Sequence, residues 1–134
     1  MAVLNDRERK FLSDNPFIGV VTDLREDGSP HSTPVWVDVD DGKVSFNTAT
    51  GRAKPRHLEN DPRVALIVTD PEDPYKWVSI TGRAELTQQG ADEQIDKLAK
   101  KYLGQDEYPW RKPEETRLKV LIDPQTVESR GIDD

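Results

Sequence analysis

Runs of apolar and β-branched residues, separated by turn signals, recur along the chain and predict a mainly β protein. Six segments have the pattern of strands: Phe17–Leu24, His31–Val39, Val44–Thr48, Val64–Thr69, Trp77–Leu86 and Leu118–Val127. Asp27-Gly28 and Asp41-Gly42 separate the first three segments, and such pairs are typical of tight hairpins. The strands are therefore expected to pair in an antiparallel manner.

Side-chain alternation and helix signals add detail to this picture. Alternate residues of the second strand are expected on opposite faces: Val35, Val37 and Val39 on one, Trp36, Asp38 and Asp40 on the other. Trp36 is interpreted as a residue that points outward from this strand. Three segments read as helices: Leu4–Leu12, Arg52–Asn60 and Ala91–Tyr102. Asn5 and Glu8 fit a capping box, and Pro55 suits a first helical turn. Gly82 indicates a bulge, and Pro124 confines part of the last strand to an edge.

Composition and charge limit the possible architectures and functions. The chain has 134 residues, of which 34% are apolar and 34% charged, so one domain over residues 1–134 is expected. Six strands with so few apolar residues are better closed into a barrel than left flat, because closure removes exposed edges. The net charge of -7 speaks against nucleic acid as a partner. The absence of cysteine excludes thiolate catalysis and cysteine-ligated metals.

The sequence also bears on where the protein is located in the cell and on whether it binds a metal. No apolar run approaches a membrane span, and the charged first residues do not resemble a signal peptide, so a cytoplasmic protein without a membrane partner is expected. No metal site is expected. A lone histidine is more often structural or exposed than a ligand, and His31 is interpreted in this way, whereas His57, within the basic helix, is expected at the surface in preference to contacting the phosphate.

The segment from Asn47 to Arg63 carries the clearest chemistry. Polar residues end a strand, Gly51 allows a tight turn, and Arg52 and Lys54 precede the expected helix start at Pro55. Free amides at a helix N-terminus and two nearby cations can converge on a phosphate. Spacing alone leaves this site and a solvated helix with surface ion pairs about equally supported.

Three segments resemble the pyridoxamine 5′-phosphate oxidase-like split barrels. Residues 46–64 are similar to the family's cofactor-phosphate segment, and Arg52-Ala53-Lys54 resembles the signature of the branch that uses the deazaflavin F420. Residues 27–35 resemble the hairpin that enters the second strand along the cofactor. Residues 77–86 resemble the strand that crosses the dimer interface. The resemblance implies a six-stranded antiparallel split β-barrel that forms a homodimer.

The resemblance also implies a set of cofactor-binding residues in a groove between two subunits. Arg52 and Lys54, with Ala53 between them, would hold the phosphate. Other residues would line the cofactor or its ring: Asn47, Thr48, Thr50, Thr33, Pro34, Val35 and, from the second subunit, Trp77. No residue is assigned a catalytic role, because no carboxylate–histidine cluster or nucleophile signature is visible.

These implications favour an F420-dependent oxidoreductase that transfers a hydride between the reduced cofactor and a small conjugated substrate. Such a cofactor carries the redox chemistry, while the protein supplies binding and orientation. FMN-dependent oxidase-like chemistry on the same fold is the alternative, and a non-catalytic cofactor-binding protein is the second. Tyr108 and Trp110 lie in an irregular segment, where covering the barrel end is preferred over closing a substrate pocket.

Overall fold

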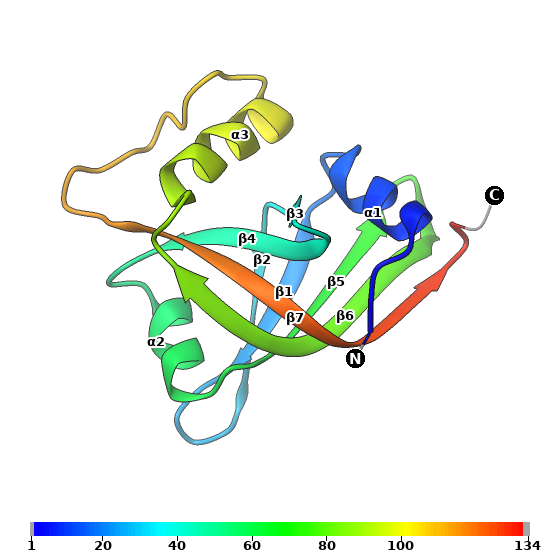
Figure 1. Ribbon diagram of the computed structural model, residues 1–134, viewed down its shortest axis with the longest axis horizontal. Coiled ribbons are helices and arrows are strands. Elements are labelled where there is room, and N and C mark those ends of the chain that lie inside the picture. The colour runs from blue at the N-terminus through cyan, green and yellow to red at the C-terminus, as the bar shows by residue number, and fades with distance from the viewer. Residues whose placement is uncertain (1, 133–134) are drawn as a thin grey trace.

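The computed structural model describes residues 2–132, whose strands form one antiparallel sheet with three helices around it (Figure 1). The strands are β1 (Gly19–Leu24), β2 (Pro30–Val35), β3 (Asp38–Asp40), β4 (Lys43–Ala49), β5 (Arg63–Asp70), β6 (Asp73–Thr87) and β7 (Arg117–Arg130). The helices are α1 (Asp6–Ser13), α2 (Ala53–Asn60) and α3 (Ala91–Leu103). The predicted fold class, a mainly β antiparallel split barrel with helices, is confirmed.

The sheet curls because its two edge strands are neighbours in the chain. Its order is β2-β1-β5-β6-β7-β4-β3, so β2 and β3 lie at opposite edges. Only Trp36 and Val37 separate these two strands, which brings the edges together at one corner. The long strands β6 and β7 sweep across the whole molecule and join its two ends (Figure 1).

The strand predicted over His31–Val39 is divided in two, so the sheet has seven strands and not six. Pairing of β2 with β1 ends at Val35, and pairing of β3 with β4 begins at Asp38. The backbone of Val37, which lies between them, is satisfied by α3: its N–H donates to Tyr102 Oη at 2.9 Å. Its carbonyl accepts from Lys101 Nζ at 2.7 Å. Side chains of α3 thus replace the ladder bonds that a continuous strand would make.

The break also changes the expected burial of the second strand. Asp38 was expected on the face opposite Val37, and it is buried, with 5% of its surface exposed. Lys97 Nζ lies 2.9 Å from its Oδ1, and Gln94 Nε2 donates to its Oδ2 at 3.3 Å. The carboxylate can be buried because these α3 side chains partner it.

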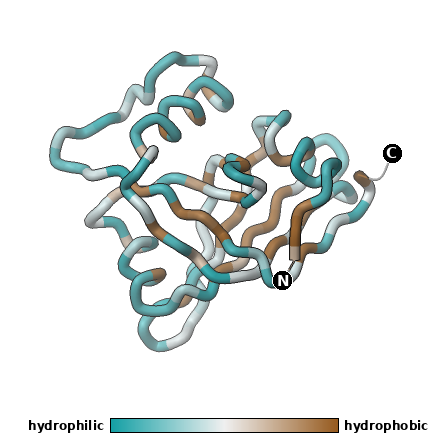
Figure 2. The backbone as a smooth tube through the Cα atoms, in the orientation of Figure 1, coloured by the Kyte–Doolittle hydropathy of each residue, from teal (hydrophilic) through white to brown (hydrophobic). Residues whose placement is uncertain are grey.

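The hydrophobic core fills the inside of the curled sheet. Phe46, Leu66, Ile80 and Ile122 are at most 1% exposed, and they come from β4, β5, β6 and β7. Apolar residues accordingly concentrate on the strands, while the helix surfaces and loops are hydrophilic (Figure 2). Helix α1 closes one end of this core with Leu12.

Local predictions at three further positions are confirmed. Asn5 Oδ1 accepts from the Glu8 amide and Glu8 Oε1 from the Asn5 amide, both at 2.8 Å, which is the expected capping box. The register of β6 and β7 shifts between Thr81 and Gly82, as the predicted bulge requires. Pro124 lies beyond the part of β7 that pairs with β4, so one side of it is an edge. Within residues 2–132, no helix is long and apolar enough to cross a membrane.

Candidate functional site

A cavity of about 290 Å³ lies where β2 and β4, the start of α2, helix α3 and the start of β7 come together. Five residues of the sequence-predicted set line it: Pro34, Val35, Asn47, Arg52 and Lys54. Ile95 and Leu98 of α3 form part of an apolar wall. The segment with a phosphate-binding pattern therefore opens onto a real cavity.

Three cations border this cavity, and two of them have no full set of partners. Lys54 is half-buried and makes no hydrogen bond or ion pair within the described residues. The side chain of Arg117 is 5% exposed, and its Nη1 has no hydrogen-bond partner. Arg52 is more exposed and pairs with Glu115 Oε2 at 3.2 Å. Buried polar groups are normally satisfied, so Lys54 and Arg117 are prepared to receive an anion.

Burial is the main cause of the pKa shifts of Lys54 and Arg117, the two underpartnered cations of the cavity. Burial is the main reason why the pKa of Lys54 is lowered; Arg52 adds to the effect, and Asp23 opposes it. Burial also lowers the pKa of Arg117, again with repulsion from Arg52. Each shift reports a desolvated positive charge. An anion bound in the cavity would favour the charged forms and raise both pKa values.

The start of α2 adds backbone donors to these cations. Gly51 has a φ of 85°, a conformation that glycine adopts readily, and it turns the chain into the helix. Arg52 is the N-cap residue, but no side chain caps the amides of the first turn. Uncapped amides and the positive end of the helix dipole favour a phosphate or carboxylate.

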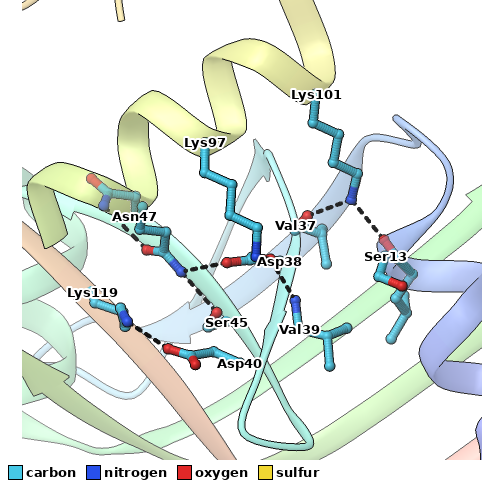
Figure 3. A network of polar contacts seen from close by, with 12 residues as sticks. Ser13, Val37, Asp38, Val39, Asp40, Ser45, Asn47, Lys97, Lys101 and Lys119 are labelled. Atoms are coloured by element: carbon cyan, nitrogen blue, oxygen red, sulfur yellow. Dashed lines mark hydrogen bonds and ion pairs between the residues drawn. The ribbon is translucent and has the colours of Figure 1, made fainter. Parts of the chain in front are cut away.

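Asn47 connects the residues of the cavity wall through hydrogen bonds of its side-chain amide. Its Oδ1 accepts from Arg117 Nε at 2.8 Å, which fixes the guanidinium. Its Nδ2 donates to the Ala91 carbonyl at 2.8 Å and to Gln94 Oε1 at 3.1 Å, which ties β4 to α3. The side chain lies between β4 and α3, within the polar network that links this helix to the sheet (Figure 3). Asn47 therefore positions Arg117 and α3 as well as lining the cavity.

Aromatic residues form the remaining wall, and the positions of three of them differ from expectation. Trp36 was expected to point outward from a strand, but it lines the cavity and stacks on Tyr102 at 5.4 Å between ring centroids. Tyr108 and Trp110 also line the cavity, so they border a pocket, which was the less favoured of their two interpretations. The Arg117 guanidinium lies 5.1 Å from the Tyr108 ring centroid, a cation–π contact.

Five predicted residues do not line the cavity: Thr33, Thr48, Thr50, Ala53 and Trp77. Thr50 Oγ1 accepts from the Thr116 amide at 3.2 Å and joins the turn to the β7 approach. Trp77 pairs with Arg130 in the first half of β6 and does not line the cavity. The cofactor role of all ten residues stays a prediction.

Sequence reasoning missed Arg117, Trp36 and the α3 wall. Arg117 is separated from Asn47 by 70 positions, and nothing in its neighbourhood resembles a binding motif. Trp36 joined the site because the chain leaves the sheet at that point. Helical spacing on α3 did predict an inward face with Ile95 and Leu98, but not what that face would border.

The sequence matches the pyridoxamine 5′-phosphate oxidase family over residues 4–130. The chain belongs to this family. Among solved structures, an F420 reductase has 25% identity and a TM-score of 0.76, over 94% of this chain and 98% of that one. Together with the family match, this neighbour supports a flavin/deazaflavin oxidoreductase-like family for the chain.

Two further solved structures share the fold at lower identity. A conserved hypothetical protein from Mycobacterium tuberculosis has 23% identity and a TM-score of 0.74, over 98% of this chain and 87% of that one. A putative pyridoxamine 5′-phosphate oxidase from Listeria innocua has 19% identity and a TM-score of 0.63, over 84% and 86%. At these identities the likeness extends to the fold alone.

Proposed function

We propose that this protein is an oxidoreductase that binds F420 through its phosphate and transfers a hydride between the reduced cofactor and a small conjugated substrate. The observation that carries this proposal is the pair of underpartnered cations, Lys54 and Arg117, in a cavity with apolar and aromatic walls. The F420 reductase among the neighbours supports the choice of deazaflavin. The cofactor supplies the redox chemistry when bound.

The described residues would bind and orient the cofactor. Arg52, Lys54 and the first amides of α2 hold the phosphate, and Arg117 provides a second, buried positive group. Pro34 and Val35 on β2 present backbone and apolar surface along the rest of the ligand. The aromatic wall excludes water on the α3 side.

The protein is further proposed to work as a homodimer in which a second copy completes the groove. Ile18 lies just before β1, Val20 lies on β1 and Ile67 lies on β5, and each is at least 40% exposed. Ile18 also lines the cavity, so a partner that covered this face would extend the cavity wall. Trp77 would reach a ligand only in such an assembly.

FMN is the second candidate cofactor, because the matching family is that of pyridoxamine 5′-phosphate oxidase. Both cofactors carry a phosphate, so the cation site accepts either. A non-catalytic binding protein would use the same residues and differ only in turnover.

Calorimetric titration of the apo-protein with F420 and with FMN tests the proposal. F420 should bind more tightly, and Arg52→Ala with Lys54→Ala should each weaken it about ten- to a hundredfold, since a charged hydrogen bond contributes about 1.5–3 kcal/mol. Lys10→Ala, which removes an equal charge from α1, should bind normally. Tighter FMN binding would move the protein to the flavin branch, and no binding of either would refute the proposal.

A further inference from the structure

A second cluster of polar groups lies where α2 packs against β1 and β2. His57 Nδ1 of α2 is 2.7 Å from Asp23 Oδ1 of β1, and His31 Nδ1 of β2 is 3.1 Å from the same oxygen. The two imidazole rings meet edge to face, with 5.1 Å between their centroids. Three side chains from three elements therefore converge on one point.

Burial makes this cluster unusual. The Asp23 side chain is 0% exposed, and its second oxygen, Oδ2, has no hydrogen-bond partner within the described residues. His57 was expected at the surface but is 8% exposed, because α2 turns it toward the sheet. A buried carboxylate with an unused oxygen is costly unless a cation or donor partners it.

We propose that Asp23, His31 and His57 bind one divalent transition metal ion of the zinc class. Two imidazole nitrogens and one carboxylate oxygen form a donor set that suits zinc and its neighbours in the first transition row. The three ligand atoms all lie within 4.8 Å of one another. A metal there would use the same buried carboxylate that now has an unused oxygen.

The spacing of the ligand atoms fits such an ion with a small adjustment. Bonds of about 2.0–2.2 Å in tetrahedral geometry place ligand atoms about 3.3 Å apart. The two nitrogen–oxygen distances, 2.7 and 3.1 Å, need to open by less than about 1 Å. The His31 side chain is 21% exposed, which gives an ion a path from solvent and leaves a coordination position for water.

Such a metal would tie α2 to the β1–β2 hairpin. Helix α2 carries Lys54 at its start and His57 in its middle, so the ion would hold the helix that borders the cavity. The proposed metal site is formed by side chains that do not line the cavity, so metal binding does not depend on which cofactor the cavity takes.

The composition of the chain makes the test specific. There is no cysteine, and His31 and His57 are the only two histidines, so any imidazole-ligated metal in untagged protein must use them. Untagged protein, stripped with a chelator and dialysed, would be titrated with Zn²⁺ by calorimetry. A separate metal-free sample would be titrated with Co²⁺ as a spectroscopic probe. One Zn²⁺ per chain and a visible absorption band of nitrogen-ligated Co²⁺ are expected.

Variants of the ligands should remove this binding. Asp23→Asn and His31→Ala should each lower Zn²⁺ affinity by more than about 100-fold, since loss of even an outer-shell partner costs about 10- to 100-fold. Glu59→Gln, an exposed acidic residue on α2, serves as the matched control and should bind Zn²⁺ normally. His31 is the more exposed histidine, so its variant is the one best able to retain the fold.

A thermal measurement separates a metal site from a purely structural cluster. Zn²⁺ should raise the melting temperature of the wild type and of Glu59→Gln, but not that of His31→Ala. Zn²⁺ binding that survives in the double variant His31→Ala/His57→Ala would overturn the proposal. So would a wild type that shows neither one-to-one Zn²⁺ binding nor a Co²⁺ band.

Discussion

At the scale of single residues, the cavity has more cations than counter-charges. Within residues 2–132, Lys54 makes no hydrogen bond or ion pair, and the buried Nη1 of Arg117 has no hydrogen-bond acceptor. Glu115 contacts Arg52 at 3.2 Å and lies 3.6 Å from Arg117 Nη1, so one carboxylate faces two guanidinium groups. The local charge is therefore positive in a chain whose net charge is -7.

The lowered pKa of Lys54 predicts a pH dependence of anion binding. Burial favours neutral lysine, so the group loses its proton below the usual pH for lysine. F420 or FMN affinity should fall as the pH rises through this lowered value, because the phosphate then loses one charged contact. Calorimetric titrations across the alkaline range would measure it.

Lys54→Arg provides the control for this pH effect. Arginine stays protonated, so the variant should bind with an affinity that changes less over the same range. A wild type and a Lys54→Arg variant with identical pH profiles would show that Lys54 does not contact the phosphate.

At the scale of secondary-structure elements, β6 and β7 are fitted together at a bulge. The register shifts after Thr81, and Gly82 pairs with Pro124. A Cβ at position 82 would lie 2.0 Å from the Asp123 carbonyl oxygen, a backbone atom that cannot swing aside. The bulge therefore requires glycine for space, although the φ of this residue is not in the left-handed region.

Gly82→Ala should destabilise the fold through this contact. We expect a loss of about 1–3 kcal/mol in the free energy of unfolding, the range for overpacked positions. Thr81→Ala, an exposed neighbour on the same strand, should change it by no more than about 0.5 kcal/mol. Urea denaturation of both variants would measure the difference, and equal stabilities would contradict the steric account.

The sequence predicted the strands and helices better than it predicted the point where the chain leaves the sheet. Hairpin signals and β-branched runs identified the strands, because those patterns act over a few residues. The break at Trp36 and Val37 was not predictable, since it depends on Tyr102 and Lys101, more than 60 positions away. The same limit applies to the site: Arg52 and Lys54 carry a local motif, whereas Arg117 reaches the cavity only through the pairing of β7 with β4.

At the scale of the whole molecule, one outer face of the sheet is unusually apolar. Ile18, Val20 and Ile67 are 48%, 41% and 40% exposed in the single chain. Ile18 lies in the segment that leads into β1, Val20 on β1 and Ile67 on β5, and Val20 pairs with Ile67 across the two strands. A second copy that packed there would bury these side chains and gain the corresponding hydrophobic free energy.

A charge on this face should disrupt self-association. Light scattering at micromolar concentration should give a dimer for the wild type and a monomer for Ile67→Lys. Both should have similar circular dichroism, because position 67 is exposed in the single chain. Val3→Lys, at a residue 79% exposed elsewhere, should remain dimeric. A monomeric wild type would remove the proposed role of Trp77.

The aromatic wall also gives this protein a built-in optical reporter. The chain has three tryptophans, and two of them, Trp36 and Trp110, border the cavity, while Trp77 lies in the first half of β6. A ligand that absorbs where indole emits would quench Trp36 and Trp110 by energy transfer, and in the proposed dimer it would also quench Trp77 of the second copy. Occupancy of the cavity can therefore be followed by intrinsic emission without any label.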